Sequence, residues 1–234
     1  MAEAPRTALV TGASSGIGRA TALALAGAGW SVLGTGRDRD ALASLSGSGI
    51  RTMAGDLTDP GFVDAVAAEA GAVGLLVNNA GTLAHAPFLE TPRHAWRGVF
   101  ALNVDALLDL TQQVAAGMAA RGAGHIVLVS SLLARKVAPN TLVYAASKHA
   151  VAAIASGLRQ ELRPHGIRVT EIAPGLVGTR IQREVTHAGV KAGYAALPFA
   201  WLAPEDIAAA ILGAAEAPPN VSTDLVEIRP QGQP

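Results

Sequence analysis

Three side chains in the middle of the chain have the types and the spacing that proton transfer requires. Ser131 ends an apolar run, Tyr144 follows it by 13 positions, and Lys148 stands 4 positions beyond Tyr144. Residues four apart lie on one face of a helix, so the phenol and the ammonium should point the same way. A phenol of pKa ~10 is a poor acid or base near neutral pH, but an adjacent ammonium favours the phenolate. A serine hydroxyl can bind a carbonyl oxygen, so the set indicates acid–base chemistry, although Tyr-x-x-x-Lys alone also occurs on helices by chance.

Glycines near the start of the chain indicate a phosphate site. A short apolar run leads into a glycine-rich turn and then into an alanine-rich helical pattern, in the order Ala8-Leu9-Val10-Thr11-Gly12-Ala13-Ser14-Ser15-Gly16-Ile17-Gly18. In such a unit Gly12 allows a sharp turn, Gly16 lets the backbone approach a pyrophosphate and Gly18 lets the helix pack closely. The N-terminus of the helix then faces the phosphates. The spacing Gly-x-x-x-Gly-x-Gly differs from the commoner fingerprint, so an ordinary tight turn is the alternative interpretation.

The end of the second predicted strand bears on the choice of cofactor. In NAD-binding folds an acidic residue about 20 positions beyond the glycines binds the ribose 2′-hydroxyl. Here that place is held by Gly36, which is followed by Arg37. A guanidinium suits a 2′-phosphate, so we expect NADP(H) to be preferred, with NAD(H) also usable. A surface arginine after a strand is the alternative interpretation.

Three more polar positions are candidates for the same site. Asp56 follows the third predicted strand, where a carboxylate can accept from an adenine amino group, but by itself it favours a turn or N-cap role. Asn78-Asn79-Ala80-Gly81 places amides at the carboxyl end of the fourth strand, where ligands bind, and is equally ordinary turn chemistry. Asn103 stands on an apolar helical stretch and must be hydrogen-bonded there, as a functional residue or as a satisfied core asparagine.

The elements that position these residues follow an alternating pattern. Strands are expected at residues 7–10, 31–34, 51–54, 75–78, 125–130, 168–173 and 225–228. Helices are expected between them, at residues 19–28, 39–45, 60–70, 92–121, 143–164 and 204–215. This alternation is typical of βαβ units, so we predict one α/β domain over residues 1–234, with a doubly wound parallel sheet of seven strands. Residues 176–203 lack clear periodicity, and because long loops are usually functional we expect a substrate lid there.

Composition limits the classes of function. The formal net charge is 0, from 18 Lys+Arg and 18 Asp+Glu, so no nucleic-acid surface is expected. The chain contains no Cys, and its 6 histidines lack metal-ligand spacing, so we expect neither a disulfide nor a metal site. No signal segment is visible, and no run approaches the ~18–20 apolar residues of a membrane span. We therefore expect a cytoplasmic protein with no membrane partner.

Taken together, these motifs resemble those of the short-chain dehydrogenase/reductase family, in its short single-domain branch. The matching positions occur in family order and spacing over nearly the whole chain: Thr11-Gly12, Gly16, Gly18, Asp56, Asn78-Asn79-Ala80-Gly81, Asn103, Ser131, Tyr144, Lys148 and Pro174-Gly175-Leu176-Val177-Gly178-Thr179. The resemblance implies a Rossmann-type sheet, a nicotinamide cofactor and hydride transfer to or from a carbonyl carbon. One departure is Ala134, where many members have Gly three positions after the serine; it should alter only the pocket wall.

The resemblance also implies roles. Tyr144 is the expected proton donor or acceptor, Ser131 binds the substrate oxygen, and Lys148 binds the nicotinamide ribose and lowers the pKa of Tyr144. Asn103, the fourth catalytic residue, positions a water in the proton relay to Lys148. The expected cofactor-binding residues are Gly12, Ser14, Ser15, Gly16, Ile17, Gly18, Arg37, Asp56, Leu57, Asn79, Ala80, Gly81, Asn103, Tyr144, Lys148, Pro174, Gly175, Val177 and Thr179, the last at the nicotinamide carboxamide. The expected substrate-binding residues are Ser131, Leu133, Tyr144 and Leu176.

The rest of the pocket is expected to be mostly apolar, which favours a mid-sized or apolar carbonyl substrate. Its remaining wall should include Val137, Ile181, Tyr194, Phe199 and Trp201, and His85 is a candidate for it. Arg135 and Lys136 lie at the expected pocket mouth, where a solvated surface pair is favoured over contact with a substrate carboxylate.

Three functions compete. The leading hypothesis is an NADPH-dependent carbonyl reductase or alcohol dehydrogenase, and the alternative is a catalytically idle NADP(H)-binding regulator on the same fold. A nucleotide-sugar epimerase or dehydratase would need a C-terminal substrate domain, and too little chain follows Thr179 to supply one. The helices predicted at 92–121 and 143–164 carry more apolar surface than one sheet face can bury, and relatives pair them between subunits. A homotetramer is therefore expected.

Overall fold

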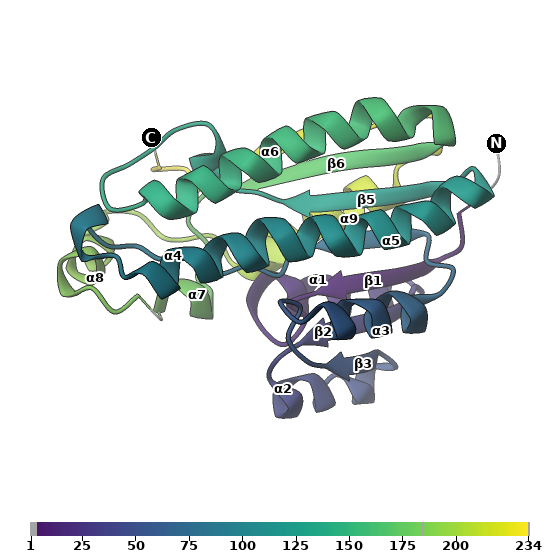
Figure 1. Cartoon of the computed structure of the whole chain (residues 1–234), viewed down its shortest axis with the longest axis horizontal. Helices are drawn as coiled ribbons and strands as arrows, with labels where there is room; N and C mark the ends of the chain where they lie inside the picture. The colour runs from purple at the N-terminus through teal and green to yellow at the C-terminus, as the bar shows by residue number, and fades with distance from the viewer. Residues whose placement is uncertain (1–3, 184, 234) are drawn as a thin grey trace.

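One parallel sheet organises the structure, which is a computed structural model that describes residues 4–183 and 185–233. Its strands are all parallel and lie in the order β3-β2-β1-β4-β5-β6-β7 (Figure 1). They are β1 (Thr7–Thr11), β2 (Ser31–Gly36), β3 (Arg51–Ala54), β4 (Leu75–Asn78), β5 (Gly124–Val129), β6 (Ile167–Pro174) and β7 (Leu225–Ile228). The predicted doubly wound sheet of seven strands is confirmed. Each strand lies within about two residues of its predicted bounds, because the apolar runs are bounded by turn residues.

Different helices cover the two faces of the sheet. One face carries α1 (Gly16–Gly27), α2 (Arg39–Ala43) and α9 (Pro204–Glu216). The other carries α3 (Pro60–Ala70), α5 (Ala106–Arg121) and α6 (Leu142–Leu162), and Figure 1 shows α5 and α6 side by side in front of the sheet. Alternate residues of β1 divide between two apolar clusters, with Leu9 in one and Ala8 and Val10 in the other. Burial on both faces explains why β4 and β5 are apolar along nearly their whole length.

The strand order reverses between β1 and β4. The chain runs from β1 outward to β3 and then returns to the other side of β1, where β4 pairs with it in register from Ala8 and Leu75 onward. The loops that leave the carboxyl ends of these two strands therefore diverge. Ligands of open α/β sheets bind at such a switch point.

The helix predicted at 92–121 is divided in the structure. It consists of α4 (Arg93–Phe100), a π-helical turn (Ala101–Asp105) and α5. The buried Asn103 lies inside the π turn. A π turn is often associated with a functional site. The apolar periodicity continues on both sides of the turn, and for this reason the sequence did not reveal the interruption.

The interval 176–203, called the lid segment below, is not irregular throughout. It contains α7 (Arg180–Arg183) and α8 (Ala188–Ala195) beyond the carboxyl ends of the strands (Figure 1). A parallel bridge between Val177 and Leu202 joins its two ends, and the Gly178 N–H donates to the Leu202 carbonyl at 2.8 Å. No residue of α8 is fully buried. The two ends of the lid segment are thus joined to each other, and its helix α8 is only partly buried.

Short 3₁₀ turns complete the chain at Ser46–Ser48, Phe88–Glu90, Leu132–Ala134 and Arg163–His165. Within the described residues, no helix combines the length and the apolar character that crossing a membrane requires.

Candidate active site

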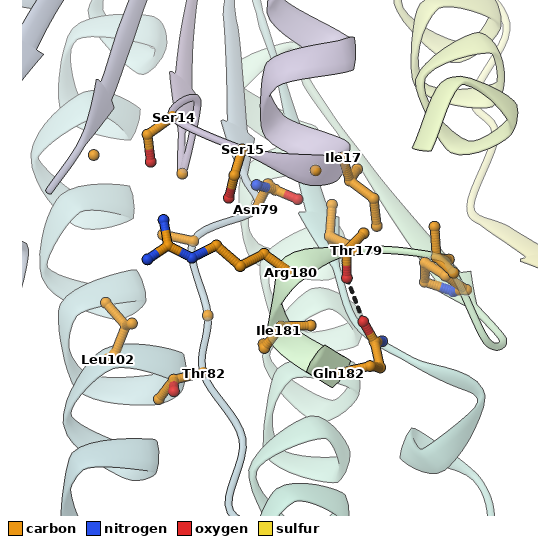
Figure 2. A pocket seen from close by; sticks show the side chains of 18 of the residues that line it. Ser14, Ser15, Ile17, Asn79, Thr82, Leu102, Thr179, Arg180, Ile181 and Gln182 are labelled. Atoms are coloured by element: carbon orange, nitrogen blue, oxygen red, sulfur yellow. Dashed lines mark hydrogen bonds between the residues drawn. The ribbon is translucent and has the colours of Figure 1, made fainter. Parts of the chain in front are cut away.

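A cleft of about 530 Å³ runs along the carboxyl ends of the strands. Figure 2 shows the glycine loop on one side of this cleft and α7 on the other. The predicted site residues that line it are Gly12, Ser14, Ser15, Gly16, Ile17, Arg37, Asp56, Leu57, Asn79, Ala80, Gly81, Ser131, Tyr144, Lys148, Pro174, Gly175, Val177 and Thr179. Four others lie outside that lining, namely Gly18, Asn103, Leu133 and Leu176.

The glycine loop has the shape of a phosphate cradle. Gly12 has a φ of 69°, and a Cβ there would lie 2.8 Å from Nδ2 of Asn79. A Cβ on Gly18 would lie 2.3 Å from the carbonyl oxygen of Gly12, so this glycine contributes by close packing rather than by lining the cleft. The helix α1 begins at Gly16, and Ser15 at its N-cap makes no side-chain capping bond. The first N–H groups of α1 are therefore available to a phosphate, which fits a bound dinucleotide.

Thr11 joins the loops of the two central strands. Its buried hydroxyl donates to the Val77 carbonyl at 3.2 Å and accepts from the backbone N–H groups of Asn79 and Ala80, each at 2.9 Å. The Asn79 side chain in turn donates to the Thr11 carbonyl at 2.9 Å. These bonds hold the glycine loop and the Asn79-Ala80-Gly81 loop in one fixed arrangement.

Two carboxylates stand beside the ends of β2 and β3. Asp56 accepts from the backbone N–H and the hydroxyl of Thr58, each at 2.9 Å, in the turn that its position suggested. That backbone bond lowers the pKa of Asp56, and the charge of Arg37 lowers it further. Asp38 caps α2 by accepting from Ala41 N–H at 3.1 Å, and this bond is the main cause of its lowered pKa.

Ser131, Tyr144 and Lys148 meet at one end of the cleft. Tyr144 and Lys148 lie in the first two turns of α6, with Lys148 Nζ 5.7 Å from the centroid of the Tyr144 ring. Lys148 Nζ donates to the Val129 carbonyl at 2.8 Å. The Ser131 hydroxyl accepts from Leu133 N–H at 3.1 Å and is a hydrogen-bond partner of the Tyr144 phenol. The structure therefore brings together the three side chains whose sequence spacing had indicated acid–base chemistry.

Burial is the main cause of the pKa shifts of Tyr144 and Lys148. It raises the pKa of Tyr144 to about 12, while the hydrogen bond with Ser131 acts the other way and nearby Tyr194 adds to the rise. Burial likewise lowers the pKa of Lys148 to about 8, against the opposing charge of Glu171. The expected lowering of the Tyr144 pKa by Lys148 is not found, because desolvation outweighs other effects and the ammonium is bonded to a backbone carbonyl.

Asn103 is fully satisfied inside the protein. Its Oδ1 accepts from Thr82 N–H at 2.8 Å, and its Nδ2 donates to the Thr82 carbonyl at 2.9 Å and to Ser147 Oγ at 3.0 Å. Ser147 donates onward to the Tyr144 carbonyl at 2.7 Å. Asn103 therefore ties the π turn to the loop after Gly81 and to the catalytic end of α6.

Aromatic residues of the lid segment approach the catalytic end. The His85 ring lies edge-on to Tyr144 with centroids 5.2 Å apart, and its Nδ1 is hydrogen-bonded to the Tyr194 hydroxyl. Tyr194 packs on Trp201, with centroids 5.5 Å apart. Burial lowers the pKa of His85 to about 4, so the imidazole is neutral at pH 7. Val137, in contrast, is 61% exposed, so its predicted place in the pocket wall is wrong.

Arg135 is exposed at the surface and is held there by ion pairs. Its guanidinium donates to both carboxylate oxygens of the buried Glu171, at 2.8 and 2.7 Å, and lies 3.2 Å from Glu227. The Ser130 hydroxyl also donates to Glu171. Arg135 and Lys136 are both exposed, as the favoured surface interpretation expected. The ion-pair partners of Arg135 come from β6 and β7, and this pairing could not be read from the sequence.

Several cleft residues were not predicted from the sequence. Asp38, Thr82, Leu102, Arg180 and Gln182 line it. Each of them directly follows or precedes a predicted residue, so proximity to Arg37, Gly81, Asn103, Thr179 and Ile181 was the available signal. Among the described residues, no group of three or more His, Cys, Asp or Glu could hold a metal ion.

Comparisons with known proteins agree with this geometry. Residues 6–189 match the family model described as short chain dehydrogenase. The chain is 41% identical over 183 residues to L-xylulose reductase from Mesocricetus auratus, covering 77% of this chain and 75% of that protein. It is 38% identical to glycine betaine reductase ATRR from Emericella nidulans over 98% of its own length but only 19% of that protein.

A solved structure gives the same result for the fold. The structure described as the closed form of serine dehydrogenase complexed with NADP+ aligns with a TM-score of 0.89 at 28% identity, covering 95% of this chain and 94% of that chain. The cradle, the catalytic cluster and these likenesses agree: the chain belongs to the short-chain dehydrogenase/reductase family of NAD(P)-dependent oxidoreductases that act on CH–OH groups.

Proposed function

We propose that this protein is an NADPH-dependent carbonyl reductase or alcohol dehydrogenase, with Tyr144 as its general acid and base. The observation that carries the proposal is the meeting of Ser131, Tyr144 and Lys148 at the end of a cleft whose other end is an uncapped helix N-terminus. A nicotinamide cofactor bound along this cleft supplies the hydride to the carbonyl carbon. The protein then has to bind the carbonyl oxygen and deliver one proton to it.

Each residue of the cluster has a part in that proton delivery. Ser131 donates a hydrogen bond to the substrate oxygen and so polarises the carbonyl. Tyr144 transfers its phenolic proton to that oxygen as the C–O double bond becomes a single bond. With a pKa raised to about 12, the Tyr144 phenol is protonated at neutral pH, which is the form that donates a proton in the reduction. The ammonium of Lys148 binds the nicotinamide ribose, and Asn103 orients the residues that return the proton.

The preference for NADPH rests on the end of β2. Position 36 carries no side chain that could hydrogen-bond a ribose 2′-hydroxyl, and the exposed Arg37 lies on the cleft wall beside it. A guanidinium binds a phosphate with charge-assisted hydrogen bonds, which are worth roughly 1.5–3 kcal/mol before the loss to solvent screening. The similar serine dehydrogenase structure holds NADP+. We therefore expect Arg37→Ala to weaken NADPH more than NADH, and Gly36→Asp to reverse the preference.

The residues around Tyr144 bear on the class of substrate, and the exposed faces of α5 and α6 bear on the oligomeric state. A neutral imidazole beside Tyr144, and Tyr194, which packs on Trp201, favour a mid-sized carbonyl compound of mainly apolar character. The helices α5 and α6 expose Leu108 and Leu142, which supports their pairing in a cytoplasmic homotetramer. Light scattering at micromolar concentration tests the tetramer, and a monomer would contradict it.

The decisive experiment is a substrate panel with a matched variant. Purified protein is mixed with NADPH and a series of aldehydes and ketones, and loss of NADPH absorbance is followed. Tyr144→Phe retains the ring but removes the proton, so turnover should fall at least ~100-fold while NADPH still binds. Cofactor binding without turnover by the wild-type protein on any member of the panel would favour the idle regulator instead.

A further inference from the structure

Arg180 crosses the cleft from the lid segment to the opposite wall. It follows Thr179, whose Cγ2 lies 3.0 Å from where a Cβ on Gly16 would be, so the backbone at this point is over the N-terminus of α1. Its side chain extends away from α7, and Figure 2 shows the guanidinium on the far side of the cleft, toward Ser14. There Nη1 lies 3.3 Å from Oδ2 of Asp38.

The place that this guanidinium reaches is the end of β2. Gly36, Arg37 and Asp38 leave that strand and line the cleft together with Ser14 and Ser15. A Cβ on Gly36 would lie 2.8 Å from Ser14 Oγ, so no side chain projects into this space from position 36. Two arginines from different elements therefore lie at the part of the groove where a dinucleotide places its adenosine ribose.

We propose that Arg180 is a second ligand of the cofactor's adenosine 2′-phosphate, supplied by the lid segment opposite Arg37. In the structure Arg180 contacts the Asp38 carboxylate, and binding of NADPH exchanges that contact for one with the phosphate. The inference rests on the proposed use of NADPH and extends it. It makes closure of the lid segment depend on the 2′-phosphate as well as on the substrate.

The ion pair with Asp38 is of the kind that exchanges readily. The two side chains are 62% and 43% exposed, and an exposed ion pair contributes little. A phosphate monoester carries close to two negative charges at pH 7 and accepts bidentate hydrogen bonds from guanidinium, so it competes well with one carboxylate. Asp38 retains its bond to Ala41 through Oδ1 after the exchange, so the start of α2 remains capped.

The test compares ligands that differ only in the 2′-phosphate. Dissociation constants of NADPH and NADH are measured by nicotinamide fluorescence, and that of 2′,5′-ADP by calorimetry. We expect Arg180→Ala to weaken NADPH and 2′,5′-ADP about 10- to 100-fold, with NADH changed by less than about threefold. Arg51→Ala is the matched control, because Arg51 is also exposed and paired with a carboxylate but does not line the cleft. It should change neither cofactor.

Two further variants test the shape of the guanidinium and the competition from the Asp38 carboxylate. Arg180→Lys keeps the charge but not the planar fork and should retain part of the preference for NADPH. Asp38→Asn retains the cap on α2 and removes the competing charge, so it should tighten NADPH; weaker NADPH binding would overturn the exchange. In wild type, NADP+ should protect the lid segment from protease more than NAD+ does, and in Arg180→Ala the two cofactors should protect it equally.

The outcomes distinguish this inference from the proposed function. Equal weakening of NADPH and NADH by Arg180→Ala would place the guanidinium at the pyrophosphate, and no weakening would remove it from the site; either result overturns the inference alone. A wild-type protein that prefers NADH, or binds neither cofactor, would instead contradict the proposed function on which the inference rests.

Discussion

Asn103 gives the sharpest test of how the catalytic end is held together. The side chain is 1% exposed and makes three hydrogen bonds, two with the Thr82 backbone and one with Ser147. Asn103→Ala removes all three of these bonds. At a net ~1 kcal/mol for each bond, the expected loss in the free energy of unfolding is about 3 kcal/mol. For a chain of this size this corresponds to a fall in Tm of about 6–12 °C.

Asn78→Ala is the matched control. Asn78 is also buried at the carboxyl end of a central strand, but its side chain donates one hydrogen bond, to Thr111 at 2.8 Å. Its loss should cost about 1 kcal/mol. Urea denaturation of both variants, with the midpoint and the slope compared with wild type, measures the difference. If Asn103→Ala proves no more destabilising than Asn78→Ala, the three bonds do not hold the π turn, and the account of this residue is wrong.

Three more expectations can be tested with the same protein. The reduction rate should fall as the pH rises through about 8, because Lys148 loses its charge there, and Lys148→Arg should move this fall to higher pH. Tryptic cleavage after Lys191 should slow when NADP+ and a substrate analogue are both present, since no residue of α8 is fully buried without them; equal rates would argue against closure. Thr11→Val removes three hydrogen bonds at constant shape, so it should lower Tm and weaken NADPH and NADH alike, whereas a selective loss of one cofactor would contradict its scaffold role.

The fold could be predicted from the sequence because its signals are local. Apolar runs bounded by Gly and Asp define the strands, and Ser131, Tyr144 and Lys148 are placed by one strand and one helix. Their meeting needed only the order of elements and the i, i+4 rule. The π turn around Asn103 was missed because it is set by hydrogen bonds to Thr82 and Ser147, which are distant in the sequence.

Electrostatic partners were harder to predict than positions. The lowered pKa expected for Tyr144 assumed that the nearby Lys148 ammonium has the largest effect on the phenol. In the structure, burial of the phenol and of the ammonium determines the direction of each pKa shift. The partners of Arg135, Glu171 and Glu227, were not predicted because they lie on strands that reach it only through the sheet order. Arg180 was not singled out because Asp38, its partner, lies 142 positions away in the chain.

The two walls of the cleft are built differently, and this determines what each controls. The strand side is preorganised, since the buried Thr11 hydroxyl alone bonds three backbone groups across β1 and β4. The lid side meets it through exposed or aromatic contacts, such as Arg180 with Asp38 and Tyr194 with His85. A ligand that closes the lid segment must offset the loss of conformational freedom in that segment. Contacts made only after closure therefore discriminate between ligands. We expect cofactor and substrate selectivity to depend on the lid segment, and the position of the bound phosphates to depend on the loops after the strands.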